Sequence, residues 1–554
     1  MTRIGAPAAA LALALASFFL FPGHTWLQQD SQIWTPMLEH LRDPAVLRND
    51  ILVQQPHVGF TLYDEAALAL RGLSGLGFRE VLALQQIAFR ACGIWGLILM
   101  ATAAGLELGP AVLVAALCSL GVAIAGPAVF TVEYEPTPRA FALPLVLLAI
   151  GLTAHRRCLA AGIAAACAFL YHPPTTLGFL AIFAVLTFRR RQWRAWIPLA
   201  LAGALLAFAA VHQHGAAQQP FWGRIGAPQE QLQRLRASYI WISAWPLRFI
   251  VHHLLLAAAL VAAWLRIRRH VPAELRAFAL GLPLLGLASM PVSWLLLEHA
   301  RWVLMPQLQP MRLLLFLALM MQFVAAVAGA HAALARRWLE AVAWFAVACW
   351  LPLQPVVTEP YQWRRVAVLL VVAAIAAAAM RFRVAPLAGA AALLLIPFAG
   401  GVVNYPRLDT PELRQLSDWA AHCTARNAVF LFPDAGRSLA PGVFRSEALR
   451  AVYVDWKGGG QVNFVRQFGE QWWLRWSETM APGFHPADMP KYGAAGIDYI
   501  VLQPQHRLPD PPLFANAGYL VYPVAPNTSI ICPNSSWQMA SINSAAPRRP
   551  FTSR

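Results

Sequence analysis

Thirteen runs of mostly apolar residues dominate the first four hundred positions of this chain. A helix that crosses a bilayer needs about 20 such residues, and most of the runs approach that length. Soluble domains carry about 25% charged residues, whereas this 554-residue chain carries 12% and is 58% hydrophobic. We therefore predict a polytopic α-helical membrane protein with about thirteen transmembrane helices. The runs lie at 5–22, 82–104, 110–130, 139–154, 158–171, 174–188, 195–212, 247–265, 275–297, 312–334, 339–353, 366–380 and 384–402.

Arginine clusters lie in every second loop between the apolar runs, and this alternation predicts the topology. Basic loops stay on the cytoplasmic side of a membrane, which places the N-terminus there, with the first run as a retained helix. The alternate loops and the C-terminal tail are then expected to face the periplasm of a bacterial inner membrane. The clusters are "HRR" at 155–157, "RRRQWR" at 189–194, "RIRRH" at 266–270, "RR" at 336–337 and "RFR" at 381–383. Because the basic residues lie between apolar runs, the net charge of +17 indicates no nucleic-acid partner.

The chain changes character after the last apolar run, so we expect a membrane domain at 1–403 and a soluble α/β domain at 404–554. "TPELRQLSDWAAHC" has a Thr that can cap a helix at Thr410, with Pro in the first helical position. "NAVFLFPD", "RAVYVDWKGG" and "GIDYIVLQP" are short β-rich runs bounded by turn residues. Cys423 and Cys532 lie in this polar region, and a disulfide between them is one alternative in an oxidising compartment.

Polar residues gather in the loops that we expect outside. We call 23–81 the first outer loop and 131–138 the second. Most of the first is interpreted as an amphipathic segment lying on the membrane, but Asp30 and Gln32 closely follow the first helix and so lie near the bilayer surface. Charged groups at helix ends can also simply reach the interface or pair with each other. The candidate site residues are Asp30, Gln32, Asp50, Glu133, Glu135, Arg139, His172, Gln309 and Arg312.

The chemistry of these residue types suits a lipid-linked phosphate. Arginine binds phosphate oxygens in a bidentate manner, and a carboxylate can take a proton from an attacking hydroxyl group. The periplasm contains no nucleotide sugars, so glycosyl transfer there must use a polyprenyl-phosphate donor.

The architecture resembles the GT-C superfamily of membrane glycosyltransferases. The resemblance rests on a long first loop with an Asp close after the first helix, on the acidic second loop "EYEPTPRAFAL", and on a soluble α/β domain after the last helix. It implies an inverting transferase in which Asp30 is the catalytic carboxylate, with Asp50 as the competing candidate. Glu133 or Glu135 would match the acidic residue of the second loop, and Arg139 and Arg312 would contact the donor phosphate. Some members use a divalent metal, which Asp30 and Glu133 would then ligate.

Two other functions remain open at this stage. A transporter or lipid flippase is less favoured, because the ionisable residues lie at helix ends and no internal repeat is evident. A catalytically silent scaffold of envelope assembly is the other alternative. No motif specifies the sugar or the acceptor.

One set of polar and aromatic residues in the tail could form either an acceptor-binding face or ion pairs at strand ends. These residues are Arg445, Arg450, Asp455, Trp456 and Lys457.

Overall fold

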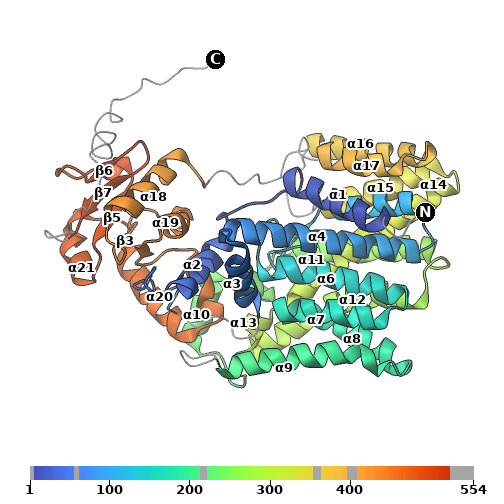
Figure 1. The fold of residues 1–554 in the computed structure, drawn as a ribbon, viewed down its shortest axis with the longest axis horizontal. Helices are drawn as coiled ribbons and strands as arrows, with labels where there is room; N and C mark the ends of the chain where they lie inside the picture. Colours follow the sequence, from blue (N-terminus) through green and yellow to red (C-terminus); the bar gives the residue numbers. More distant parts are fainter. Residues whose placement is uncertain (1–4, 55–60, 213–220, 354–362, 396–407, 525–554) are drawn as a thin grey trace, which may run out of the picture.

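A bundle of apolar helices forms the larger part of the molecule, and a smaller α/β domain lies beside its end (Figure 1). The computed structural model describes residues 5–54, 61–212, 221–353, 363–395 and 408–524. Within these ranges six helical segments are long and apolar enough to cross a membrane, and seven shorter apolar helices accompany them. Together they match the thirteen predicted runs, and the predicted fold class is confirmed. The bundle helices are α1 (Gly5–Phe19), α4 (Phe78–Ala103), α5 (Leu108–Cys118), α6 (Pro138–Ala154), α7 (Cys158–Tyr171), α8 (Pro173–Arg189), α9 (Ile197–His212), α11 (Leu247–Ile267), α12 (Ala273–Ser293), α14 (Leu314–Leu334), α15 (Trp338–Leu353), α16 (Trp363–Arg381) and α17 (Ala385–Leu395).

Burial differs sharply between the helices of the bundle. Nearly every residue of α14 is buried, as expected for a helix that is apolar all round and lies at the centre. By contrast, α9 exposes Leu201, Leu205 and Phe208, which is the pattern of a lipid-facing helix. Helices α4 and α6 approach closely where Gly93 has no side chain. A Cβ added to Gly93 would lie only 2.8 Å from the Pro144 Cβ. This close packing fixes the start of α6, which follows directly on the second outer loop.

The run predicted at 110–130 is wrong in its second half. Helix α5 ends at Cys118, and a hairpin follows in which β1 (Ala123–Ile124) pairs antiparallel with β2 (Val129–Phe130). Gly121 and Gly126 have φ angles of +73° and +94°, which other residues rarely adopt. The apolar composition alone could not reveal this turn, because the hairpin is as hydrophobic as a helix.

The tail domain is built on a five-stranded sheet of order β4-β3-β5-β7-β6. Strands β4, β3 and β5 are parallel, β7 pairs antiparallel with β5, and β6 pairs antiparallel with β7. The three predicted strand runs and the predicted helix are all present, and Thr410 caps that helix by accepting a hydrogen bond from the Leu413 N–H at 3.2 Å. The elements are α18 (Pro411–Cys423), β3 (Val429–Leu431), α19 (Ala440–Ala448), β4 (Ala451–Val452), α20 (Arg466–Thr479), α21 (Met489–Ala494), β5 (Tyr499–Leu502), β6 (Phe514–Ala515) and β7 (Leu520–Pro523). Cys423 is disulfide-bonded, and Cys532 lies outside the described residues.

The first outer loop packs against the tail domain, which corrects its interpretation as a segment lying on the membrane. It contains α2 (Ser31–Arg42) and α3 (Tyr63–Ser74). Seven of its buried apolar residues join the core of the tail sheet, because covering the apolar face of an amphipathic helix with another domain removes it from water. The loop residues in this shared core are Ile33, Met37, Val46, Leu47, Ile51, Leu52 and Val53. Leu38, Tyr63 and Ala67 instead pack against α4 and α6.

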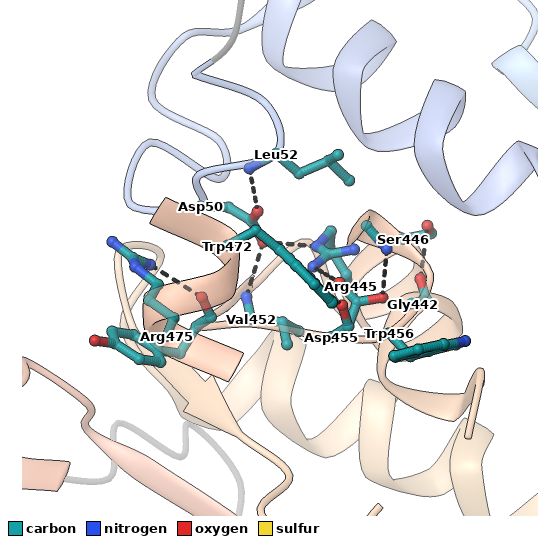
Figure 2. Close-up of polar contacts among 12 residues, drawn as sticks. Asp50, Leu52, Gly442, Arg445, Ser446, Val452, Asp455, Trp456, Trp472 and Arg475 are labelled. Carbon is teal, nitrogen blue, oxygen red and sulfur yellow. Dashed lines mark hydrogen bonds and ion pairs between the residues drawn. The ribbon is translucent and has the colours of Figure 1, made fainter. Parts of the chain in front are cut away.

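A buried ion-pair network fastens this contact (Figure 2). Arg445 Nε donates to Asp50 Oδ2 at 2.6 Å, and the other side of the guanidinium pairs with Asp455. The N–H groups of Val452 and Leu52 donate to the two Asp50 oxygens, each at 2.9 Å. Asp50 therefore joins the loop to β4.

Candidate active site

A cavity of about 650 Å³ lies where the two outer loops, the ends of several bundle helices and the tail domain meet. Its walls come from segments separated by more than four hundred positions in the chain. Seven of the nine candidate residues line it, namely Asp30, Glu133, Glu135, Arg139, His172, Gln309 and Arg312. The sequence thus identified most of the charged lining residues without showing how they are brought together.

Asp30 presents its carboxylate to the cavity. It stands at the N-terminal cap of α2 but makes no capping bond with its side chain. Instead, Lys457 Nζ donates to Asp30 Oδ1 at 2.7 Å, and 44% of the Asp30 side chain is exposed. Burial alone would raise the pKa of Asp30, but the Lys457 ammonium, with Arg139 and Arg312 beyond it, lowers that pKa to about 2. The carboxylate is therefore ionised at neutral pH.

Glu135 explains why the Asp30 side chain is free to face the cavity. Its Oε1 accepts hydrogen bonds from the N–H groups of Gln28 and Gln29, both at 2.7 Å. Ser31 adds its N–H at 3.0 Å to Oε2 and its hydroxyl at 3.0 Å to Oε1. The Glu135 carboxylate thus takes over the capping of α2. Burial raises the pKa of Glu135, while the Ser31 N–H opposes that shift.

Glu133 and Arg139 form a buried ion pair on the opposite wall. Arg139 Nε donates to Glu133 Oε1 at 2.6 Å. Arg139 lies in the first turn of α6, directly after Pro138. The carbonyl of Glu133 also accepts bonds from Arg90 Nη2 and Gln86 Nε2 on α4, each at 3.0 Å. Helix α4 thereby holds the second outer loop in place.

Arg312, like Arg236, is a cavity cation for which the described residues provide no carboxylate within 4.0 Å. It lies in a short 3-10 helix (Pro310–Leu313) just before α14. Its Nε–H is buried and has no hydrogen-bond acceptor in the described part of the chain. Its Cζ lies 5.8 Å from the centre of the Tyr239 ring, which is a favourable face for a cation. A buried guanidinium with an open donor favours an anionic ligand.

Gln309 and His172 complete the polar wall near Arg312. Gln309 has a left-handed φ of 45° and its Nε2 donates to the Pro306 carbonyl at 2.8 Å. His172 Nδ1 accepts the Thr175 N–H at 3.3 Å at the start of α8, which leaves the proton of the neutral ring on Nε2. Burial, together with the Arg139 and Arg312 guanidinium groups, lowers the pKa of His172 well below its usual value. The neutral ring adds no charge to the site.

Two candidates lie elsewhere. Asp50 belongs to the buried network with Arg445, and Gln32 is fully buried with its Nε2 bonded to the Leu27 carbonyl at 2.7 Å. Gln32 faces α19, because a Cβ added to Gly442 would collide with its side chain. Both residues hold the first outer loop against the tail domain, and neither lines the cavity.

Lys457 and Arg236 also line the cavity, and neither is among the candidate residues predicted from the sequence. "KGGG" reads as a turn, yet its lysine bonds Asp30. A signal was present, since Lys457 is one of only two lysines in an arginine-rich chain. Arg236, at the end of α10 (Ala227–Arg236), donates Nη2 to the Trp456 carbonyl at 2.6 Å, and its Cζ lies 4.1 Å from that ring's centre. Of the tail group, Arg445 and Asp455 form structural ion pairs and Arg450 bonds carbonyls within the tail domain.

The residues present do not fit a divalent metal held by Asp30 and Glu133. Each carboxylate is already neutralised, one by Lys457 and the other by Arg139. No group of three or more His, Cys, Asp or Glu side chains in the described ranges is arranged to hold a metal ion. A metal would have to displace two ion pairs and would meet the positive charge of Arg312.

The rest of the cavity is apolar, which makes the whole site amphiphilic. Phe169, Leu304 and Leu308 line it, together with Leu206 and Ala207 on the lipid-facing helix α9. The cations of the lining lie at the start of α6 (Arg139), just before α14 (Arg312), at the end of α10 (Arg236) and in the tail domain (Lys457). This distribution favours a ligand that has an anionic head and a hydrocarbon chain.

No protein-family model and no curated protein matches the sequence. Among solved structures, the chain is similar to the crystal structure of ArnT from Cupriavidus metallidurans in the apo state. The two share 14% sequence identity and a TM-score of 0.48, and the match covers 95% of this chain and 98% of that chain.

Proposed function

We propose that this protein transfers a sugar from a polyprenyl-phosphate donor to an acceptor at the outer face of the bacterial inner membrane. One observation carries the proposal. An ionised carboxylate, Asp30, and a half-buried guanidinium with an open Nε donor, Arg312, line the same cavity, and apolar side chains line it as well. The partners are thus the bilayer, the lipid-linked donor and an acceptor of unspecified identity.

The transfer is a single displacement at the anomeric carbon of the sugar. The acceptor oxygen forms a bond to that carbon while the bond from the carbon to the phosphate oxygen breaks, and both electrons of that bond leave with the phosphate. Asp30 takes the acceptor proton and later releases it to the polyprenyl phosphate or to water. The anomeric configuration is inverted.

Cations of the cavity stabilise the charge that develops on the departing phosphate. Arg312 has an open donor for it, and the Arg139 guanidinium can contribute donors not used by Glu133. Asp30 with a pKa near 2 is a weak base before the donor binds. The donor phosphate draws on the same cations, so its arrival raises the pKa of Asp30 toward a more useful value.

Binding of a lipid phosphate to Arg312 is the first test. Full-length protein is titrated with farnesyl phosphate and, in parallel, with farnesol, and binding is followed by thermal stabilisation. We expect the phosphate to bind and the alcohol to bind at least tenfold more weakly, since a bond to a charged group contributes about 1.5–3 kcal/mol. Arg312→Gln should remove this preference, while Arg301→Gln, an exposed arginine paired with Glu230, should keep it. Equal binding of both lipids by the wild type would contradict the proposal.

A catalytically silent scaffold is the second candidate, and one observation favours it. The carboxylates of Asp30 and Glu133 each form an ion pair, as expected for residues with a structural rather than a catalytic role. This candidate predicts lipid-phosphate binding without any transfer of sugar. Release of labelled polyprenyl phosphate from a donor by wild-type membranes, and its loss in Asp30→Asn, would decide against it.

A further inference from the structure

A second cavity lies in the tail domain, at the edge of its sheet. The chain leaves β3 toward β4 on one side, and later enters β5 on the other side of β3. The carboxyl ends of β3 and β5 therefore flank a topological switch point, which is where α/β sheets bind ligands. A cavity of about 270 Å³ occupies this position, and its walls include Phe432 and Asp434 after β3 and Gln503 after β5.

The walls of this second cavity are held in place by specific bonds. Asp434 Oδ2 accepts the Gln503 N–H at 2.7 Å, which joins the loops that follow the two strands. Asn516 Nδ2 donates to the Glu412 carbonyl at 2.8 Å, and its Oδ1 accepts the Tyr519 N–H at 2.8 Å. The turn before β7 is thereby fixed against the first turn of α18. The cavity is a built feature of the fold.

The lining has a definite chemistry. It offers two carboxylates, hydroxyl groups, one amide and two aromatic rings, and no Lys or Arg is among its described lining residues. Without a cation it does not suit a phosphate or another anion. Carboxylates and hydroxyls instead accept hydrogen bonds from a ligand rich in O–H donors, and ring faces suit the C–H surface of a sugar. The polar and aromatic lining residues are Thr410, Glu412, Phe432, Asp434, Ser438, Gln503 and Tyr519.

We propose that this second cavity binds one sugar unit of a neutral glycan. Its volume lies just below the range of about 300–1,000 Å³ that is typical of ligand pockets, so it suits one ring rather than a long chain. The site stands apart from the lipid-phosphate chemistry, because none of its lining residues lines the larger cavity. If the transferase proposal also holds, the sugar bound here belongs to the acceptor.

Ligand-observed saturation-transfer NMR on the full-length protein tests this inference. The protein is kept in a detergent without a sugar head group, since an alkyl glycoside would compete. The probes are glucose, galactose, mannose and N-acetylglucosamine, and inorganic phosphate is added as an anionic competitor. We expect at least one of the four sugars to bind saturably and phosphate not to reduce its signal.

Matched variants assign the signal to the second cavity. Glu412→Ala and Ser438→Ala each remove a lining group at a partly or fully exposed position, and each should weaken sugar binding about tenfold. Glu478→Ala, at an exposed position on α20, should leave it unchanged, and so should Asp30→Asn in the larger cavity. The inference is overturned if no sugar binds, if both lining variants bind like the wild type, or if Asp30→Asn alone removes binding.

Discussion

Among single residues, we expect Asp30 to have the largest effect on the rate of the proposed sugar transfer. Replacing it by Asn keeps the shape of the side chain, which is 44% exposed, and removes only its capacity to hold a negative charge or take a proton. We expect Asp30→Asn to lower sugar transfer by about 100-fold or more, the usual contribution of a general base. The assay is transfer of labelled sugar from synthetic polyprenyl-phosphate donors into an envelope fraction. Asp43→Asn, on the same loop, is the control, and an unchanged rate in Asp30→Asn would rule out the assigned role.

The partner of Asp30 sets its response to pH. Because the pKa of Asp30 is lowered to about 2, the carboxylate and its bond to Lys457 persist well below pH 4. The stability that this pair contributes is complete above the unfolded pKa of about 3.9 and is lost as pH falls through the folded value. In Lys457→Met the strongest opposition to burial is lost and only Arg139 and Arg312 remain, so the pKa of Asp30 should rise.

The acid limb of kcat/KM should therefore move to higher pH in Lys457→Met, from about pH 2 toward the ordinary Asp value of about 3.9. In profiles recorded from about pH 3.5 to pH 8, the variant should lose activity toward the acid end while the wild type does not. Lys491→Met provides the matched control, because it removes the other lysine of the chain, whose Nζ bonds a backbone carbonyl. Superimposable profiles for the two variants would mean that Lys457 does not act through Asp30.

At the scale of elements, Glu135 links the second outer loop to the start of α2. The Glu135 carboxylate accepts all four of its hydrogen bonds. In Glu135→Gln the NH₂ group of the amide would therefore face one or more N–H or O–H donors and could not accept from them. We expect a loss of about 1–3 kcal/mol in stability, together with a fall in kcat while farnesyl phosphate still binds. Thermal unfolding and transfer kinetics measure the two effects. Glu80→Gln, exposed in the first turn of α4, is the comparison, and a normal kcat in Glu135→Gln would limit Glu135 to a structural role.

The elements themselves were largely predictable from local chemistry. The Thr-Pro start of α18, the three β-rich runs and the spacing of the apolar helices follow from capping, turn residues and hydrophobic periodicity. The hairpin after α5 was not predictable, because glycine conformation rather than hydropathy decides it. Seven candidate residues line the cavity because helix ends on one side of a bundle must converge. Lys457 could not be placed, since its contact with Asp30 depends on how a separate domain docks.

At the scale of the whole molecule, docking of the tail domain rests on the network of Asp50, Arg445 and Asp455. Removing one partner leaves a buried charge only partly compensated, which costs about 3–5 kcal/mol. We expect Asp50→Ala to lower the thermal midpoint and to reduce transfer, because Asp455 stands two positions before Lys457. Tryptophan fluorescence during heating would measure the first effect. Asp43→Ala, whose pairing with Arg426 is loose at 3.8 Å, should change neither quantity, and a wild-type midpoint in Asp50→Ala would refute the docking role.

The bond between Asp30 and Lys457 joins positions 427 residues apart. During biosynthesis the first of these residues is made early, and the second only after all thirteen apolar helices have left the ribosome. The larger cavity therefore has no complete wall until the tail domain has been made and has folded onto the first outer loop. A chain that is made only in part holds Asp30 without its lysine, so completion of the site is coupled to completion of the chain.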